Sequence, residues 1–135
     1  MGRRHRRGSN AIEFALTLPI FVILFSGMID FSWYFFSGWR VSAAVREGLR
    51  VGSLTPLANA PEEQANKALS NAAGAYQITW ASGFPVTAVF GSAPDCGIRV
   101  EAQADVKPLI GLVRVVPTVV AYEAVMRLED QTCKL

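Results

Sequence analysis

The chain has 135 residues, of which 51% are hydrophobic and 18% charged, and its formal net charge is +2. This length suits one small domain plus one membrane segment. Residues 1–39 carry four arginines and two acids, whereas residues 40–135 carry nine basic and nine acidic side chains. A downstream domain without net charge gives no electrostatic basis for nucleic-acid binding, so we expect no nucleic-acid partner.

A basic cluster opens the chain, formed by Arg3, Arg4, His5, Arg6 and Arg7. In isolation such a cluster is typical of a nucleic-acid or targeting patch. Next to a hydrophobic run, however, it predicts an N-terminus held on the cytoplasmic side of a membrane. The four arginines are therefore interpreted as a topology anchor.

The hydrophobic run covers residues 14–29, sixteen residues without a charge. A membrane span needs about 20 residues, and continuing past Asp30 to residue 36 supplies them. An interfacial aromatic belt is expected next, and the sequence there has Trp33, Tyr34 and Trp39. Pro19 lacks a backbone donor and should bend or locally open the helix. A cleaved secretory signal is the alternative, although bulky aromatic residues follow the run and the first small pair, Ala43-Ala44, lies too far downstream.

The helical pattern continues outside the membrane, with an apolar stripe made by Val41, Ala44, Val45 and Leu49. We predict one helix over residues 9–50, weakened by Gly48 and ended by Gly52 together with Pro56. A loop over residues 52–60 should separate it from the next element.

A second, short helix is expected to begin at Pro61 and to end near Gly74. Glu62 and Glu63 favour its N-terminus because they complement the helix dipole. Its small apolar face would consist of Ala65, Ala68, Leu69 and Ala72.

From Tyr76 onward the hydrophobic period changes to two, which predicts half-buried antiparallel strands. The expected strands cover residues 76–80, 86–90, 98–107 and 117–129. We therefore predict an α+β fold: a long N-terminal transmembrane helix that continues outside the membrane, a short helix, and a small antiparallel sheet of three or four strands. Open sheet edges have no place in a bilayer, so this part should lie outside it.

Charge complementarity suggests the register of the last two strands. Setting Arg99 opposite Glu129 also sets Glu101 opposite Arg127, giving two ion pairs on the solvent face.

The same register places Cys96 opposite Thr132, one residue from Cys133. A Cys96–Cys133 disulfide is then geometrically plausible outside the cytoplasm. Two unpaired small side chains are the alternative.

The connection before the last strand is unusually apolar, with Leu109, Ile110, Leu112, Val113, Val115 and Val116. The favoured interpretation is that these side chains cap the core. The alternative is an exposed patch for a partner or a lipid surface.

An enzyme is not expected. His5 is the only histidine, so a nucleophilic serine or cysteine would lack its usual base. Two cysteines and one histidine do not make an ordinary structural zinc site. Glu101 and Asp105 share a strand face with basic and polar side chains, which favours a solvated surface over an acid/base pair. We expect no catalytic residue, metal or cofactor.

The order of a glycine, an acid and a proline at the start of the run resembles a known family. The residues are Gly8-Ser9-Asn10-Ala11-Ile12-Glu13-Phe14-Ala15-Leu16, then Leu18-Pro19, then Gly27-Met28-Ile29-Asp30-Phe31. They resemble the N-terminal signature of TadE-like minor pseudopilins, which belong to the tight adherence (Flp, type IVc) pilus machinery. Residues 119–129 also resemble the closing strand of such proteins, more weakly.

The resemblance implies that a prepilin peptidase cuts between Gly8 and Ser9. Residues 1–8 would be the leader, 9–52 the transmembrane and assembly helix, and 53–135 an extracytoplasmic α+β domain. Glu13 would then pair with the Ser9 amine of a neighbouring subunit, since both charges are poorly accommodated in lipid. Without processing, Glu13 is an interfacial acid favourable to the helix dipole.

The assembly helix would include Glu13, Phe14, Pro19 and Asp30. For Asp30 two interpretations stay open: it hydrates near the outer headgroups, or it bonds across subunits or to an assembly platform.

The implied function is a minor pseudopilin that supports pilus assembly, adhesion or secretion. Its partners would be the prepilin peptidase, the major pilin and other pseudopilins, the assembly platform of the inner membrane, and the lipid bilayer. It would sit in the inner membrane with its C-terminal domain in the periplasm or outside the cell. The alternatives are an unprocessed single-span anchor that binds a secretion-system component, and a secreted binding module released by signal cleavage.

Overall fold

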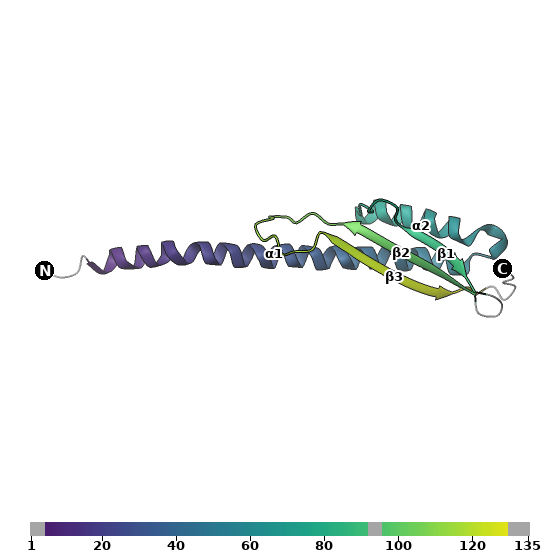
Figure 1. Ribbon diagram of the computed structural model, residues 1–135, viewed down its shortest axis with the longest axis horizontal. Helices are drawn as coiled ribbons and strands as arrows, with labels where there is room; N and C mark the ends of the chain where they lie inside the picture. The colour runs from purple at the N-terminus through teal and green to yellow at the C-terminus, as the bar shows by residue number, and fades with distance from the viewer. Residues whose placement is uncertain (1–4, 92–95, 130–135) are drawn as a thin grey trace.

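The computed structural model describes residues 5–91 and 96–129. The elements in chain order are α1 (His5–Leu54), the 3-10 turn η1 (Leu57–Asn59), α2 (Pro61–Tyr76), β1 (Val86–Phe90), β2 (Gly97–Asp105) and β3 (Val119–Arg127). Figure 1 shows an elongated molecule in which the first half of α1 projects alone and the second half packs against the sheet and α2. The predicted α+β class is confirmed.

Helix α1 is longer than predicted because neither of two glycines ends it. It passes through Gly48 and Gly52 and stops at Leu54. Both glycines instead allow close packing: a Cβ on Gly48 would lie 2.6 Å from Leu69 Cγ, and one on Gly52 would lie 2.5 Å from Ile98 Cδ1. Real Cβ atoms do not approach heavy atoms this closely, so the contacts require glycine. The predicted end near residue 50 is therefore wrong.

The membrane half of α1 also continues without interruption through Pro19. Two residues before Pro19, the Thr17 hydroxyl donates to the backbone oxygen of Glu13 at 3.0 Å. The helix does not break at the proline.

Helix α2 begins at Pro61, as predicted, and ends at Tyr76, two residues after Gly74. Gln77, in the left-handed conformation at φ 53°, caps it by donating its backbone N–H to the carbonyl oxygens of Ala73 and Gly74. The predicted strand over residues 76–80 is absent, because Tyr76 is still helical and Trp80 forms only an isolated bridge to Ala104.

The sheet has three antiparallel strands in the order β1-β2-β3. Its inner face packs on the second half of α1 and on α2. The core comprises Val41, Val45, Leu49, Ala65, Leu69, Cys96, Ile98, Val100, Ala102, Ala104, Val106, Val120 and Leu128. Small side chains at positions 65, 102 and 104 let the helices lie close to one another and to the sheet.

The predicted register of β2 and β3 is wrong by four residues. Arg99 faces Val125 and Glu101 faces Glu123. An even shift keeps the same side chains on the inner face, so the alternating pattern cannot distinguish the two registers. The observed one sets the small Ala102 opposite the large Tyr122, which fills the space beneath the strands.

The charged side chains of β2 and β3 form other ion pairs than those predicted. Arg99 bridges Glu123 at 3.3 Å and Glu101 at 3.7 Å, which offsets the repulsion between two directly opposed carboxylates. Cys96 neighbours Leu128, whose N–H donates to the Cys96 carbonyl oxygen at 3.0 Å, and Thr132, its predicted neighbour, lies outside the described residues.

Candidate functional site

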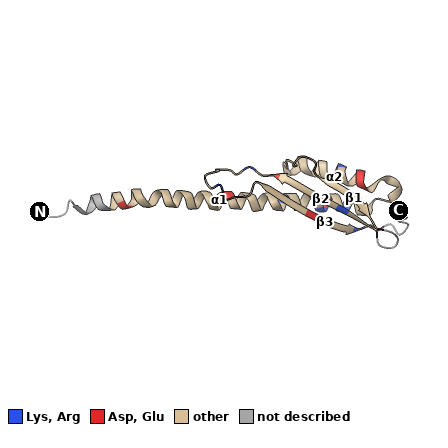
Figure 2. Ribbon diagram, in the orientation of Figure 1, with Lys and Arg blue, Asp and Glu red and all other residues tan. Residues whose placement is uncertain are grey.

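The free half of α1 is apolar on every side and fully exposed. Every residue from 10 to 25 is exposed, including Phe14 at 65% and Leu16 at 70%. A surface helix of a globular protein has one apolar stripe, whereas an apolar helix without a polar face needs an apolar surrounding. The sequence has no charged residue between Glu13 and Asp30, and the ribbon of this part of α1 is tan, the colour of uncharged residues, in Figure 2.

Within the described residues, the single helix long and apolar enough to cross a membrane lies in the stretch Asn10–Leu54. Almost none of its most apolar part is buried in the molecule, which separates it from the core helix of a globular domain. The helix is compatible with membrane anchoring.

The residues of the predicted processing site lie at the start of this helix. Gly8 and Ser9 are in the first turns of α1 with Arg6 and Arg7, whereas Arg3 and Arg4 lie outside the described residues. Cleavage and the topology anchor stay predictions.

Glu13 is exposed and forms no ion pair with any side chain that the structure describes. Its carboxylate is therefore available to a group outside the chain. Its pairing with the amine of a neighbouring subunit stays a prediction.

Asp30 occupies a place that the sequence did not predict. It is 0% exposed, and its two carboxylate oxygens accept hydrogen bonds from the backbone N–H groups of Ile110, at 2.9 Å, and Gly111, at 3.0 Å. A buried carboxylate is tolerated when such donors satisfy it, and charge-assisted bonds are stronger than neutral ones. The expectation that Asp30 hydrates near headgroups is wrong, and its oxygens are engaged within the chain.

The loop that Asp30 holds joins β2 to β3 and covers residues 106–118; we call it the β2–β3 loop. The N–H of Val106 closes its base by donating to the carbonyl oxygen of Thr118 at 2.7 Å. Gly111 adopts φ +71°, a left-handed conformation that favours glycine. Figure 1 shows the loop reaching beyond the sheet along α1, toward the N-terminal end of the helix.

Most apolar side chains of the β2–β3 loop are exposed. Val116 is buried and Val113 half-buried, and the exposed members are Leu109 (59%), Ile110 (46%), Leu112 (59%) and Val115 (78%). The favoured expectation that the loop caps the core is therefore wrong, and the alternative, an exposed apolar patch, is what the structure contains.

One face of α1 packs against both the β2–β3 loop and the hydrophobic core. Its fully covered positions begin with three polar side chains and continue into the apolar core: Ser26, Asp30, Ser37, Val41, Ala44, Val45 and Leu49. The helical spacing of the polar members with Val41 was a signal that could have placed Asp30 on the covered face.

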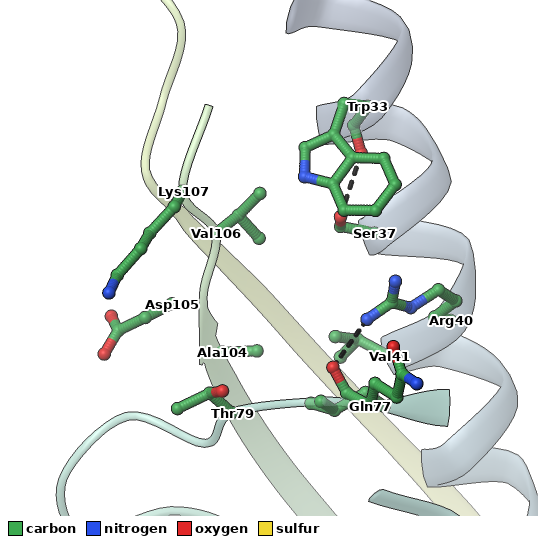
Figure 3. Close-up of a pocket in the computed structure, with 11 residues that line it drawn as sticks. Trp33, Ser37, Arg40, Val41, Gln77, Thr79, Ala104, Asp105, Val106 and Lys107 are labelled. Atoms are coloured by element: carbon green, nitrogen blue, oxygen red, sulfur yellow. Dashed lines mark hydrogen bonds between the residues drawn. The ribbon is translucent and has the colours of Figure 1, made fainter. Parts of the chain in front are cut away.

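A cavity of about 430 Å³ lies between α1, the segment after α2 and the end of β2 (Figure 3). Arg40 enters it from α1 and donates from Nη2 to the backbone oxygen of Gln77 at 2.7 Å. Its guanidinium lies 5.6 Å from the ring centroids of both Trp33 and Phe36. Arg40 thus ties α1 to the segment that follows α2.

The opposite wall of the cavity carries Asp105 and Lys107 (Figure 3). Ser37, its hydroxyl-bearing residue on α1, donates to the Trp33 carbonyl oxygen at 2.9 Å. No group of three potential metal ligands occurs among the described residues. The arrangement holds α1 against the segment after α2.

The remaining predicted positions lie at the sheet. Glu101 belongs to the half-exposed ion-pair network around Arg99, and Asp105 is exposed, in agreement with a solvated face. Cys96 is buried at 3% exposure, and Cys133 lies outside the described residues, so the disulfide stays a prediction.

The family model for TadE-like proteins matches residues 8–50. The chain carries a TadE-like segment. The match begins at the predicted cleavage glycine, includes Glu13, Pro19 and Asp30, and ends where α1 packs against α2. It confirms the resemblance seen in the sequence. The folded part of the chain after residue 50 lies outside the match, and the comparisons with curated proteins and with solved structures gave no match.

Proposed function

We propose that the chain is a minor pseudopilin of a tight adherence pilus, with a structural and not a catalytic role. The observation that carries this proposal is the coincidence of two features in α1. The helix is exposed and apolar on all sides over residues 10–25, and the TadE-like match covers the same stretch and starts at Gly8.

In this proposal the precursor inserts with its arginines on the cytoplasmic side, and a prepilin peptidase cuts between Gly8 and Ser9. Glu13 then becomes the fifth residue of the mature chain. Its exposed carboxylate, without an ionic partner among the described side chains, pairs with the new amine of a neighbouring subunit. Each charge neutralises the other where water is scarce.

Assembly follows from the shape of the molecule. The apolar half of α1 packs among the helices of the major pilin and other pseudopilins, and the α+β domain stays outside the membrane. Residues 10–25 are all exposed, so they are available for such packing.

The runner-up function is an unprocessed single-span anchor whose outer domain binds a secretion-system component. The exposed apolar helix supports this function equally well. The TadE-like match from Gly8 onward favours the processed pseudopilin.

A photo-cross-linking amino acid at position 16 tests the proposal in cells that contain a tight adherence system. Leu16 is 70% exposed on α1, so we expect adducts with pilins or pseudopilins that decrease when Glu13 is replaced by Ala. The same amino acid at position 125, on the exposed surface of β3, is the control and should be insensitive to Glu13. Lipid adducts alone at position 16 would support the anchor instead.

A further inference from the structure

We propose that the β2–β3 loop is a second membrane contact, which enters the outer leaflet beside α1. Asp30 holds this loop against the helix, so both α1 and the β2–β3 loop contact the bilayer. The inference rests on the proposed membrane insertion of α1.

The depth of Asp30 along the helix is the first argument. Residues rise about 1.5 Å each along an α-helix, and the hydrocarbon region is about 30 Å thick. If that region begins at Phe14, directly after Glu13, Asp30 lies about 24 Å into it and about 6 Å below its outer edge. The clamp therefore holds Ile110 and Gly111 at the depth of the outer leaflet.

The surface of the loop is the second argument. Leu109, Leu112 and Val115 are 59%, 59% and 78% exposed, an unfavourable arrangement in water for neighbouring large apolar side chains. Leu109 also lines an apolar hollow on the flank of α1 together with Phe25, Met28, Ile29, Trp33 and Phe36. The loop and the helix thus form one continuous apolar surface. The lipid environment proposed for α1 therefore also favours burial of the loop side chains.

The backbone of the loop fits the same surrounding. Unsatisfied N–H groups are costly in hydrocarbon, and irregular backbone is tolerated there only when they are satisfied. Ile110 and Gly111 donate to Asp30, and Pro108 and Pro117 have no N–H to satisfy, whereas the N–H groups of residues 112–116 donate to no group of the described chain. The carboxylate thereby satisfies both N–H groups in the part of the loop that lies deepest against α1.

The flanking side chains agree with this depth. Trp33 and Tyr34, the amphipathic aromatic residues one turn above Asp30, belong at the membrane–water boundary. Arg114 is exposed in the loop and is long enough to reach headgroup phosphates from a position just below them. Two attachment points, α1 and the loop, would fix the height and rotation of the α+β domain on the membrane.

The test places a small fluorescent amino acid at position 112 of the full chain in vesicles of neutral phospholipid, at low protein density. Brominated acyl chains report lipid contact, and iodide reports water contact. Position 24 (57% exposed, in α1) is the lipid control, and position 125 (51% exposed, in β3) is the aqueous control. We expect lipid quenching at position 112 to match that at position 24, with iodide protection.

The outcomes separate the inference from the proposed function. Iodide quenching at 112 with lipid quenching at 24 overturns the loop contact alone, whereas iodide quenching at both positions overturns membrane insertion itself. Protection from both quenchers at 112 means that protein covers the loop, which also overturns the inference. Asp30→Ala should shift position 112 toward iodide quenching, and Glu63→Ala, which removes an exposed acid from α2, should not.

Discussion

The carboxylate of Asp30 accepts a hydrogen bond from the backbone N–H of Gly111 at 3.0 Å, across 81 residues of sequence. With the neighbouring bond from Ile110, it fastens the far end of the β2–β3 loop to α1. The contact lies between the free apolar half of α1 and the half that forms the core. It therefore joins the part proposed for the membrane to the part that folds outside it.

Replacing Asp30 should release the loop without unfolding the domain, because the core begins one turn beyond Ser37. Hydrogen bonds to a charged group contribute about 1.5–3 kcal/mol. We therefore expect the amides of Ile110 and Gly111 in Asp30→Ala to exchange about 10–100 times faster, as measured by hydrogen exchange. Asp30→Asn keeps one acceptor and should give a smaller increase. Equal protection in wild type and Asp30→Ala would contradict the clamp.

Gly48 should be intolerant of alanine although it lies inside a helix. Gly→Ala in a helix normally stabilises by up to about 1 kcal/mol, but here the new Cβ would meet buried Leu69 at 2.6 Å. Overpacking should dominate and lower the free energy of unfolding by about 1–2 kcal/mol. Gly74, in α2 with nothing within 4 Å, is the matched control.

Urea unfolding of the full chain in detergent would measure both variants. Gly74→Ala should stabilise and Gly48→Ala should destabilise. A stabilising Gly48→Ala would show that α1 and α2 are farther apart than described.

The register of β2 and β3 can be tested through charge. Arg99→Ala leaves Glu101 directly opposite Glu123, so we expect destabilisation of up to about 1 kcal/mol at low salt. Glu123→Gln should recover part of this loss in the double variant, since it removes the repulsion. A double-mutant cycle without coupling would contradict the pairing of these two positions.

Glu13 should matter for assembly but not for folding, because it is exposed and contacts no described ionic partner. Glu13→Gln should still be cut but should enter filament or platform complexes less efficiently, as measured by co-purification with the major pilin. Glu47→Gln, an exposed acid farther along α1, is the control. Equal incorporation of the Glu13→Gln and Glu47→Gln variants would contradict the proposed pairing of Glu13 with the amine of a neighbouring subunit.

Local patterns were sufficient to predict most of the elements. The uninterrupted apolar run, Pro61 with its two acids, and strict alternation in β2 and β3 gave the long helix, the short helix and the antiparallel sheet. The register was not predictable, because a four-residue shift preserves the inner face.

The candidate site was only half predictable, for a related reason. The exposed helix and its TadE-like signature are local properties of sequence. Asp30 holds the loop through hydrogen bonds to backbone N–H groups, which every residue except proline has. The side chains at positions 110 and 111 therefore do not predict these bonds. In the sequence, Gly48 likewise indicates only a weakened helix. Its role in close packing follows from the contact with Leu69, which only the structure shows.

Mass spectrometry of the mature N-terminus tests the pseudopilin proposal directly, with the full chain expressed with and without a prepilin peptidase. We predict a chain that starts at Ser9 only when the peptidase is present, and no such chain from Gly8→Ala. An intact N-terminus that keeps Arg3 to Arg7 under both conditions would contradict the pseudopilin proposal and favour the unprocessed anchor.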